Sequence, residues 1–231
     1  ASLNAQTTSL PKNSPISVLS SIKTIETVDL NELTTFDPRW VDSLSLSLPC
    51  YEVPVPKRTM RLPNAPRNYR NGIHRGLDFF ANWGTPVRSV AEGVVVRSDL
   101  HYEEVPADFR ENLLKATTKV GHTPSDIFNS VLLGKSVFLD HGFDLIPGFR
   151  TISIYAHLSH IEKEIVPGAV VKRGELLGKS GNTGMRESTI GSKAGSHLHW
   201  EMILQKGEQE IYLGKGMSNP ELYDMLFRIF N

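Results

Sequence analysis

The segment His197–Leu204, which reads HLHWEMIL, decides the fold because its residue types alternate as they do in a β-strand. Side chains two residues apart in a strand project from the same face, roughly 6.5–7 Å apart, so His197 and His199 share one face. Leu198 and Trp200 then point to the opposite side, where we expect the hydrophobic core. The segment therefore predicts a strand that buries one face and presents two histidines on the other.

Further short strands precede this segment, separated by turns that contain Gly or Pro. Pro86–Val90 and Gly93–Arg97 are expected to form a tight hairpin. Ser136–Asp140 and Thr151–His157 are expected to form a second pair, and Glu175–Ser180 a further strand. The predicted fold class is therefore mainly β, an antiparallel sheet or sandwich.

Two helical segments interrupt this pattern of strands. Residues 99–134 read as a helical insertion, in which Thr123 is expected to cap a helix and Gly134 to end one. Asn219 to Phe230 predict a closing helix. We expect the chain to have three parts: an N-terminal arm or tail at 1–60 that can lie across a groove, a core at 61–213 that contains the insertion, and a C-terminal helical segment at 214–231.

The composition excludes several classes of protein. The chain has 231 residues, with 25 Lys+Arg against 25 Asp+Glu. This balance argues against a protein that grips a phosphate backbone, so we expect no nucleic-acid partner. No apolar run approaches the roughly 18–20 residues that a membrane span needs. The first residues, ASLNAQTTSL, show no signal peptide, and we expect that one has been removed.

The single cysteine limits how a metal can be bound. Cys50 alone permits neither an internal disulfide nor a Cys-rich zinc site, so histidine and carboxylate must hold any metal. A thiolate of Cys50 could cap a zinc ion from the arm. A buried cysteine without such a role is the more common case.

The histidines that can carry chemistry lie in three short segments, HRGLD at 74–78, YAHL at 155–158 and the strand described above. A catalytic zinc takes three protein ligands and leaves a position for water, whose pKa it lowers toward 7. His74 and Asp78 can supply two ligands and one histidine of the His-x-His pair the third, although strand geometry leaves open which one. A single buried histidine is more often a hydrogen-bonded core residue, so only the combination is informative.

Together these residues resemble the M23 family of lysostaphin- or LytM-type zinc metallopeptidases, which cut the peptide part of bacterial peptidoglycan. The resemblance covers roughly residues 60–205 and implies a LytM-type antiparallel β core (a duplicated hybrid motif) with the active site in a groove. It implies one zinc ion on His74, Asp78 and His199, with His157 and His197 as catalytic histidines. It rests on motifs in the family's order: HRGLDF (74–79), GTPV (84–87), AEGVV (91–95), DHG (140–142), YAHLS (155–159), VVKRGE (170–175), GNTG (181–184) and HLHWE (197–201).

The resemblance implies a zinc-dependent endopeptidase of peptidoglycan cross-links or stem peptides, acting through a metal-activated water in the periplasm or extracellular envelope. Its partners would be peptidoglycan peptides. The alternative is a non-catalytic or latent envelope protein that binds peptidoglycan or regulates an amidase. A histidine phosphocarrier ranks lower, because the pair His74 and Asp78 has no purpose there. We expect the segments 99–134 and 185–195, longer than usual in the family, to wall the groove. We expect Arg75, Asn71 and Tyr155 to lie at its rim.

Overall fold

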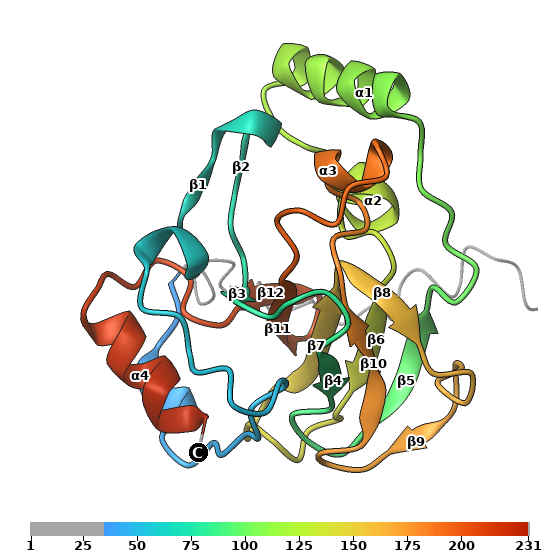
Figure 1. Ribbon diagram of the computed structural model, residues 1–231. Helices are drawn as coiled ribbons and strands as arrows, with labels where there is room; N and C mark the ends of the chain where they lie inside the picture. The colour runs from blue at the N-terminus through green and yellow to red at the C-terminus, as the bar shows by residue number, and fades with distance from the viewer. Residues whose placement is uncertain (1–34, 231) are drawn as a thin grey trace, which may run out of the picture. The chain divides into compact units, whose positions relative to one another are not determined.

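The structure is a computed structural model that describes residues 35–230 (Figure 1). Its strands form three sheets, and every pairing between named strands is antiparallel. The mainly β, antiparallel fold class is therefore confirmed. The two-stranded sheet pairs β1 (Pro66–Arg67) with β2 (Gly72–Ile73), and the three-stranded sheet has the order β4 (Pro86–Arg88), β10 (Leu176–Ser180), β8 (Leu158–Ile161). The seven-stranded sheet has the order β12 (Gln209–Tyr212), β11 (Leu198–Lys206), β7 (Arg150–Ala156), β6 (Val137–Asp140), β5 (Gly93–Ser98), β9 (Val170–Val171), with β3 (Leu77–Phe79) also paired to β11.

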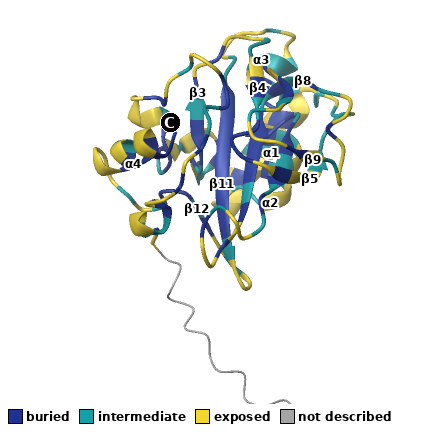
Figure 2. Cartoon of the chain, turned by 90° about the horizontal axis from the view of Figure 1, so that it is seen from below, coloured by how far each residue is buried: buried dark blue, intermediate teal, exposed yellow. Residues whose placement is uncertain are grey.

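Strand β11 is an inner strand of the largest sheet, next to the edge strands β12 and β3, and is the strand predicted from the His-x-His segment. It pairs with β7, β12 and β3, and its register sets His199 opposite Asp78 on β3. Figure 2 shows it as a buried strand through the middle of the molecule. Leu198 and Trp200 are fully buried in the main hydrophobic core, as the alternation predicts.

The helical insertion packs on the sheet through a second, smaller core. Phe128 and Leu132 of the insertion pack with Ile154 of β7 and Ile203 of β11. Strand β11 therefore contributes to both cores, because Trp200 belongs to the main one. This explains why its burial is nearly continuous even though its residue types alternate.

The predicted strand pairs had different outcomes. β6 and β7 do pair, as expected for the segments near Ser136–Asp140 and Thr151–His157. The hairpin expected from Pro86–Val90 and Gly93–Arg97 is wrong, because β4 pairs with β10 while β5 pairs with β6 and β9. The two segments belong to different sheets, so the residues between them connect layers.

The helices lie where the sequence predicts them, with different caps. The insertion contains α1 (Ala107–Val120), α2 (Ser125–Ile127) and a π-helical turn, η6 (Phe128–Leu132), and the chain closes with α4 (Glu221–Ile229). Thr123 does not cap α2, because its hydroxyl donates to the carbonyl of Arg70 instead. Gly134 does end the insertion in a left-handed conformation. The remaining helices are α3 (Arg186–Thr189) and the 3-10 turns η3 (Pro38–Val41), η4 (Thr59–Arg61) and η5 (Asn68–Arg70). Within residues 35–230, no helix has the length and apolar character needed to cross a bilayer.

Residues 35–60 of the predicted arm pack into the main core. Phe36, Val41 and Leu46 are buried there together with Leu226 and Phe230 of the C-terminal segment. The part of the predicted arm at residues 1–34 lies outside the described residues, so its groove-covering role stays a prediction.

Candidate metal centre

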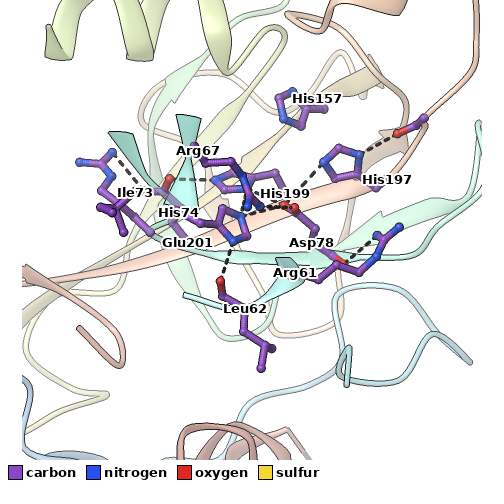
Figure 3. Close-up of polar contacts among 12 residues, drawn as sticks. Arg61, Leu62, Arg67, Ile73, His74, Asp78, His157, His197, His199 and Glu201 are labelled. Atoms are coloured by element: carbon purple, nitrogen blue, oxygen red, sulfur yellow. Dashed lines mark hydrogen bonds and ion pairs between the residues drawn. The ribbon is translucent and has the colours of Figure 1, made fainter. Parts of the chain in front are cut away.

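Three side chains from different elements bring their donor atoms together at the end of β11 (Figure 3). His74 Nε2 lies 2.9 Å from Asp78 Oδ1 and 3.1 Å from His199 Nδ1, and His199 Nδ1 lies 2.9 Å from Asp78 Oδ1. Asp78 sits on β3 and His199 on β11, in direct register, while His74 lies in the loop that leads into β3. The pairing of two strands therefore creates the cluster.

Hydrogen bonds on the outer side of this cluster determine which ring nitrogen of each histidine faces the centre. The Nδ1–H of His74 donates to the Leu62 carbonyl at 2.8 Å, and the Nε2–H of His199 donates to Glu201 Oε1 at 2.8 Å. In its neutral form, each imidazole then presents a lone pair to the centre. Hydrogen-bonded carboxylates and carbonyls orient metal-binding histidines in the same way in known sites. The other oxygen of Asp78 accepts from Arg67 at 2.8 Å.

The donor set fits a zinc ion. Three donors bound about 2.0–2.2 Å from a tetrahedral zinc lie roughly 3.3–3.5 Å from one another. The observed separations of 2.9–3.1 Å require an outward shift of only a few tenths of an ångström. Without a cation, three lone pairs would face one another at contact distance, which favours either a bound metal or a proton in its place.

The pKa shifts of the cluster residues in the metal-free protein also favour a cation at this position. Burial lowers the pKa of His199, but hydrogen bonds to Asp78 and Glu201 outweigh burial and raise its pKa to about 9. Burial raises the pKa of Asp78, but the charges and hydrogen bonds of His74 and His199 hold it well below its usual range. Burial also lowers the pKa of His74, although Asp78 acts in the opposite direction. A positive charge in this cluster is thus strongly stabilised.

Two further histidines face the cluster without joining it. The Nδ1–H of His157 donates to the Thr183 carbonyl and that of His197 to the Gly195 carbonyl, both at 2.8 Å. Their rings lie 4.9 Å apart, and the His157 ring lies 5.6 Å from that of His199. Burial lowers the pKa of both residues, that of His157 well below the ordinary value. The Nε2 of His197 lies 3.6 Å from Asp78 Oδ1, whereas the Nε2 of His157 has no hydrogen-bond partner among the described residues.

The five predicted site residues line one pocket of about 490 Å³. Its far wall is formed by the insertion and by the segment at 185–195, both expected to wall a groove. The wall residues of these segments are Arg110, Glu111 and Leu114 of α1, Phe128, Leu132, Leu133, and Met185 to Glu187 at the start of α3.

Sequence reasoning missed or misplaced several contacts. Glu201 was quoted only as part of a motif, although its position two residues after His199 puts it on the same face. The salt bridge from Arg67 to Asp78 had no signal in the sequence. Tyr155 is not a rim residue, because it is fully buried and its hydroxyl accepts from the Val90 backbone N–H. Arg75 reaches inward, where it pairs with Glu201 at 3.1 Å.

Cys50 is buried in the main core. Burial raises the pKa of its thiol to about 12. Among the described residues, the metal-binding cluster consists of His74, Asp78 and His199, without this cysteine.

Residues 116–211 match the sequence model described as Peptidase family M23. The chain resembles peptidase family M23. The matched residues include three of the histidines of the site, His157, His197 and His199, whereas His74 and Asp78 precede them in the chain. This match supports a peptidase role for the M23-like chain.

Curated relatives and a solved structure are similar at low identity. The L-Ala–D-Glu endopeptidase of Bacillus subtilis is 26% identical over 142 residues, which make up 60% of this chain and 32% of that protein. An uncharacterized metalloprotease of Buchnera aphidicola is 26% identical over 141 residues, or 61% of this chain and 26% of that protein. The chain thus spans about a third or less of the relatives' length. The catalytic domain of the antimicrobial peptidase lysostaphin from Staphylococcus simulans is 21% identical, with 73% of this chain and 86% of that chain covered and a TM-score of 0.38.

Proposed function

We propose that the chain is a zinc-dependent endopeptidase that hydrolyses peptide bonds in bacterial peptidoglycan, in cross-links or stem peptides, in the cell envelope. The observation that carries the proposal is the cluster of lone-pair donors on His74, Asp78 and His199, with two neutral histidines beside it. The resemblance to family M23 supports the reaction class. The substrate class is supported by one relative, which is named as an L-Ala–D-Glu endopeptidase.

In this proposal His74 Nε2, Asp78 Oδ1 and His199 Nδ1 would hold the zinc ion. When bound, zinc would supply Lewis acidity that activates a water molecule and polarises a carbonyl group. Leu62, Glu201 and Arg67 hold the three ligands in orientation through the hydrogen bonds described above.

His157 and His197 would move protons. Because the Nδ1–H of each is engaged by a backbone carbonyl, each Nε2 can accept a proton from the attacking water. The imidazolium that forms can then donate to the developing oxyanion or to the leaving amine. The neutral state of both residues before reaction, caused by burial, suits this role.

Digestion of defined muropeptides, with products identified by mass spectrometry, tests the proposal. We expect the zinc-loaded protein to release peptide fragments, and His199→Ala and Asp78→Ala to lose both zinc and cleavage. His157→Ala should keep zinc and lose turnover by about 10²–10⁴-fold. His101→Ala, an exposed histidine outside the pocket, serves as the control and should behave as the wild type.

The alternative function, that of a non-catalytic envelope protein, predicts the opposite result in the same assay. It predicts that the zinc-loaded protein leaves every muropeptide intact while still binding peptidoglycan. Cleavage that persists in a zinc-free His199→Ala protein would refute the metallopeptidase proposal.

A further inference from the structure

The pocket that contains the donor cluster continues past it toward the helical insertion, and this continuation contains two buried arginines. Arg70, on η5, and Arg110, on α1, are each only 7% exposed and both line the pocket. Buried arginines are rare unless their charge is compensated. In Figure 1, α1, α2 and α3 gather at one end of the molecule, so this part of the pocket lies on the side of the insertion.

Arg110 has unused hydrogen-bonding capacity. Its Nε donates to the Gly184 carbonyl at 3.0 Å, which fixes the side chain. Within residues 35–230, no hydrogen-bond acceptor or ion-pair partner engages its two terminal nitrogens. A guanidinium held at Nε leaves a planar fork of N–H groups, and this fork matches a carboxylate in two parallel hydrogen bonds.

Arg70 adds a second positive charge to this wall. Its Nη2 donates to the Ile73 carbonyl at 2.6 Å, and its guanidinium lies 4.6 Å from the centre of the Phe128 ring. Burial lowers the pKa of Arg70, although Tyr69 and Glu201 act in the opposite direction. Two acidic residues, Glu111 and Glu187, also line the pocket, but both are more exposed than the arginines and neither forms an ion pair with them in the described part of the chain.

One loop fixes the position of Arg110 relative to His157. The carbonyl of Thr183 accepts from His157, and the carbonyl of the next residue, Gly184, accepts from Arg110. Neighbouring residues are about 3.8 Å apart along a chain, and an extended peptide advances about 3.3–3.6 Å per residue. A group bound by Arg110 is therefore held no more than a few residues of extended peptide from a bond that reacts beside His157.

We propose that Arg110, assisted by Arg70, forms a carboxylate-binding subsite, so that the substrate is a peptide with a free carboxylate within a few residues of the scissile bond. This proposal rests on the proposed peptidase function and narrows its substrate class. Stem peptides carry such carboxylates, whereas an uncharged glycine bridge does not.

A carboxamide scan of one stem peptide tests this subsite. Each free carboxylate, internal or C-terminal, is replaced in turn by the uncharged carboxamide, and kcat/KM is measured for each peptide. We expect one replacement, within a few residues of the cleaved bond, to lower kcat/KM of the wild type by about 10- to 100-fold. Arg110→Gln should show the same loss on the acid peptide and no further loss on the amide. Lys119→Gln, which removes an exposed charge from the same helix, should keep the wild-type preference.

Two results would overturn the subsite: a wild-type protein that cleaves all carboxamides within about threefold of the acid peptide, or an Arg110→Gln protein that retains the preference. If Arg110→Gln does not fold, the wild-type scan and Arg70→Gln decide in its place. If the wild type cleaves no peptide, the proposed function fails on its own. The subsite is then judged from peptide binding by fluorescence anisotropy, where equal affinities for acid and amide forms would overturn it.

Discussion

The fully buried carboxylate of Glu201 allows a sharp test of whether the cluster of His74, Asp78 and His199 binds a metal ion. Its Oε1 accepts the Nε2–H of His199 at 2.8 Å, and its Oε2 lies 3.1 Å from Arg75. Glu201→Gln keeps the shape of the side chain and removes the charge. We expect this single change to weaken zinc binding although Glu201 does not belong to the donor cluster.

The magnitude follows from the type of hydrogen bond that is lost. A hydrogen bond to a charged acceptor contributes about 1.5–3 kcal/mol and one to a neutral acceptor about 0.5–1.5 kcal/mol. The exchange should therefore cost about 1–1.5 kcal/mol, or about 5- to 13-fold in the Kd for zinc. Glu201→Ala removes the acceptor altogether and should cost about 10- to 100-fold, as outer partners of metal ligands do.

Competition with a chromophoric chelator measures these zinc affinities without reference to activity. The visible absorption of the cobalt(II)-substituted protein reports in parallel whether the coordination geometry is kept. Glu210→Gln is the matched control, because Glu210 is an exposed glutamate on the neighbouring strand β12. Zinc affinities of Glu201→Gln and Glu201→Ala within twofold of the wild type would refute the reasoning.

Three further predictions concern stability. Zinc at a thousandfold excess over its Kd should stabilise the fold by about 4 kcal/mol and raise Tm by about 8–16 °C in calorimetry, whereas Asp78→Ala should show no shift. Phe128→Leu, which removes the ring that Arg70 and Arg75 contact at 4.6 and 4.7 Å, should lower the free energy of unfolding in urea by about 1–2 kcal/mol, more than Phe109→Leu at an exposed position. Because burial raises the pKa of Cys50 from 9.0 to about 12, its thiol should resist iodoacetamide in the folded protein, and its contribution to stability should be present below about pH 9 and lost as the pH rises toward 12. Urea titrations of the wild type and of Cys50→Ala at pH 8 and 10 test this loss of stability with rising pH. An equal pH dependence of the free energy of unfolding in both proteins would contradict it.

The local sequence pattern was sufficient to predict β11, because one segment shows both the alternation of a strand and the two histidines of the site. Alternation in His197–Leu204 predicted β11, the burial of Leu198 and Trp200, and a shared face for two histidines. The same rule could have extended to Glu201, two residues further on. It could not supply Arg67, because nothing in the local sequence shows that this side chain returns to Asp78.

Long-range pairing limited the rest of the prediction. The turn-like residues between Pro86–Val90 and Gly93–Arg97 suggested a hairpin, but the partner of β4 is β10, almost ninety residues later in the chain. Tyr155 was misplaced for a related reason, because it is buried with residues distant in sequence, and its hydroxyl accepts from the backbone N–H of Val90. Hydrophobic patterning shows which residues are buried and not which segments bury them.

The backbone conformation of His157 has a structural role as well, because this residue joins two sheets. The residue has a φ of +60° and is the single link between β7, in the seven-stranded sheet, and β8, in the three-stranded sheet. Few side chains tolerate this conformation, and asparagine is among those that do, as histidine is. A replacement at this position therefore has to meet two requirements, the proposed proton transfer and the left-handed backbone conformation. His157→Asn is accordingly a cleaner chemical knockout than His157→Ala, because it removes the imidazole while keeping a residue that accepts the joint between the two sheets.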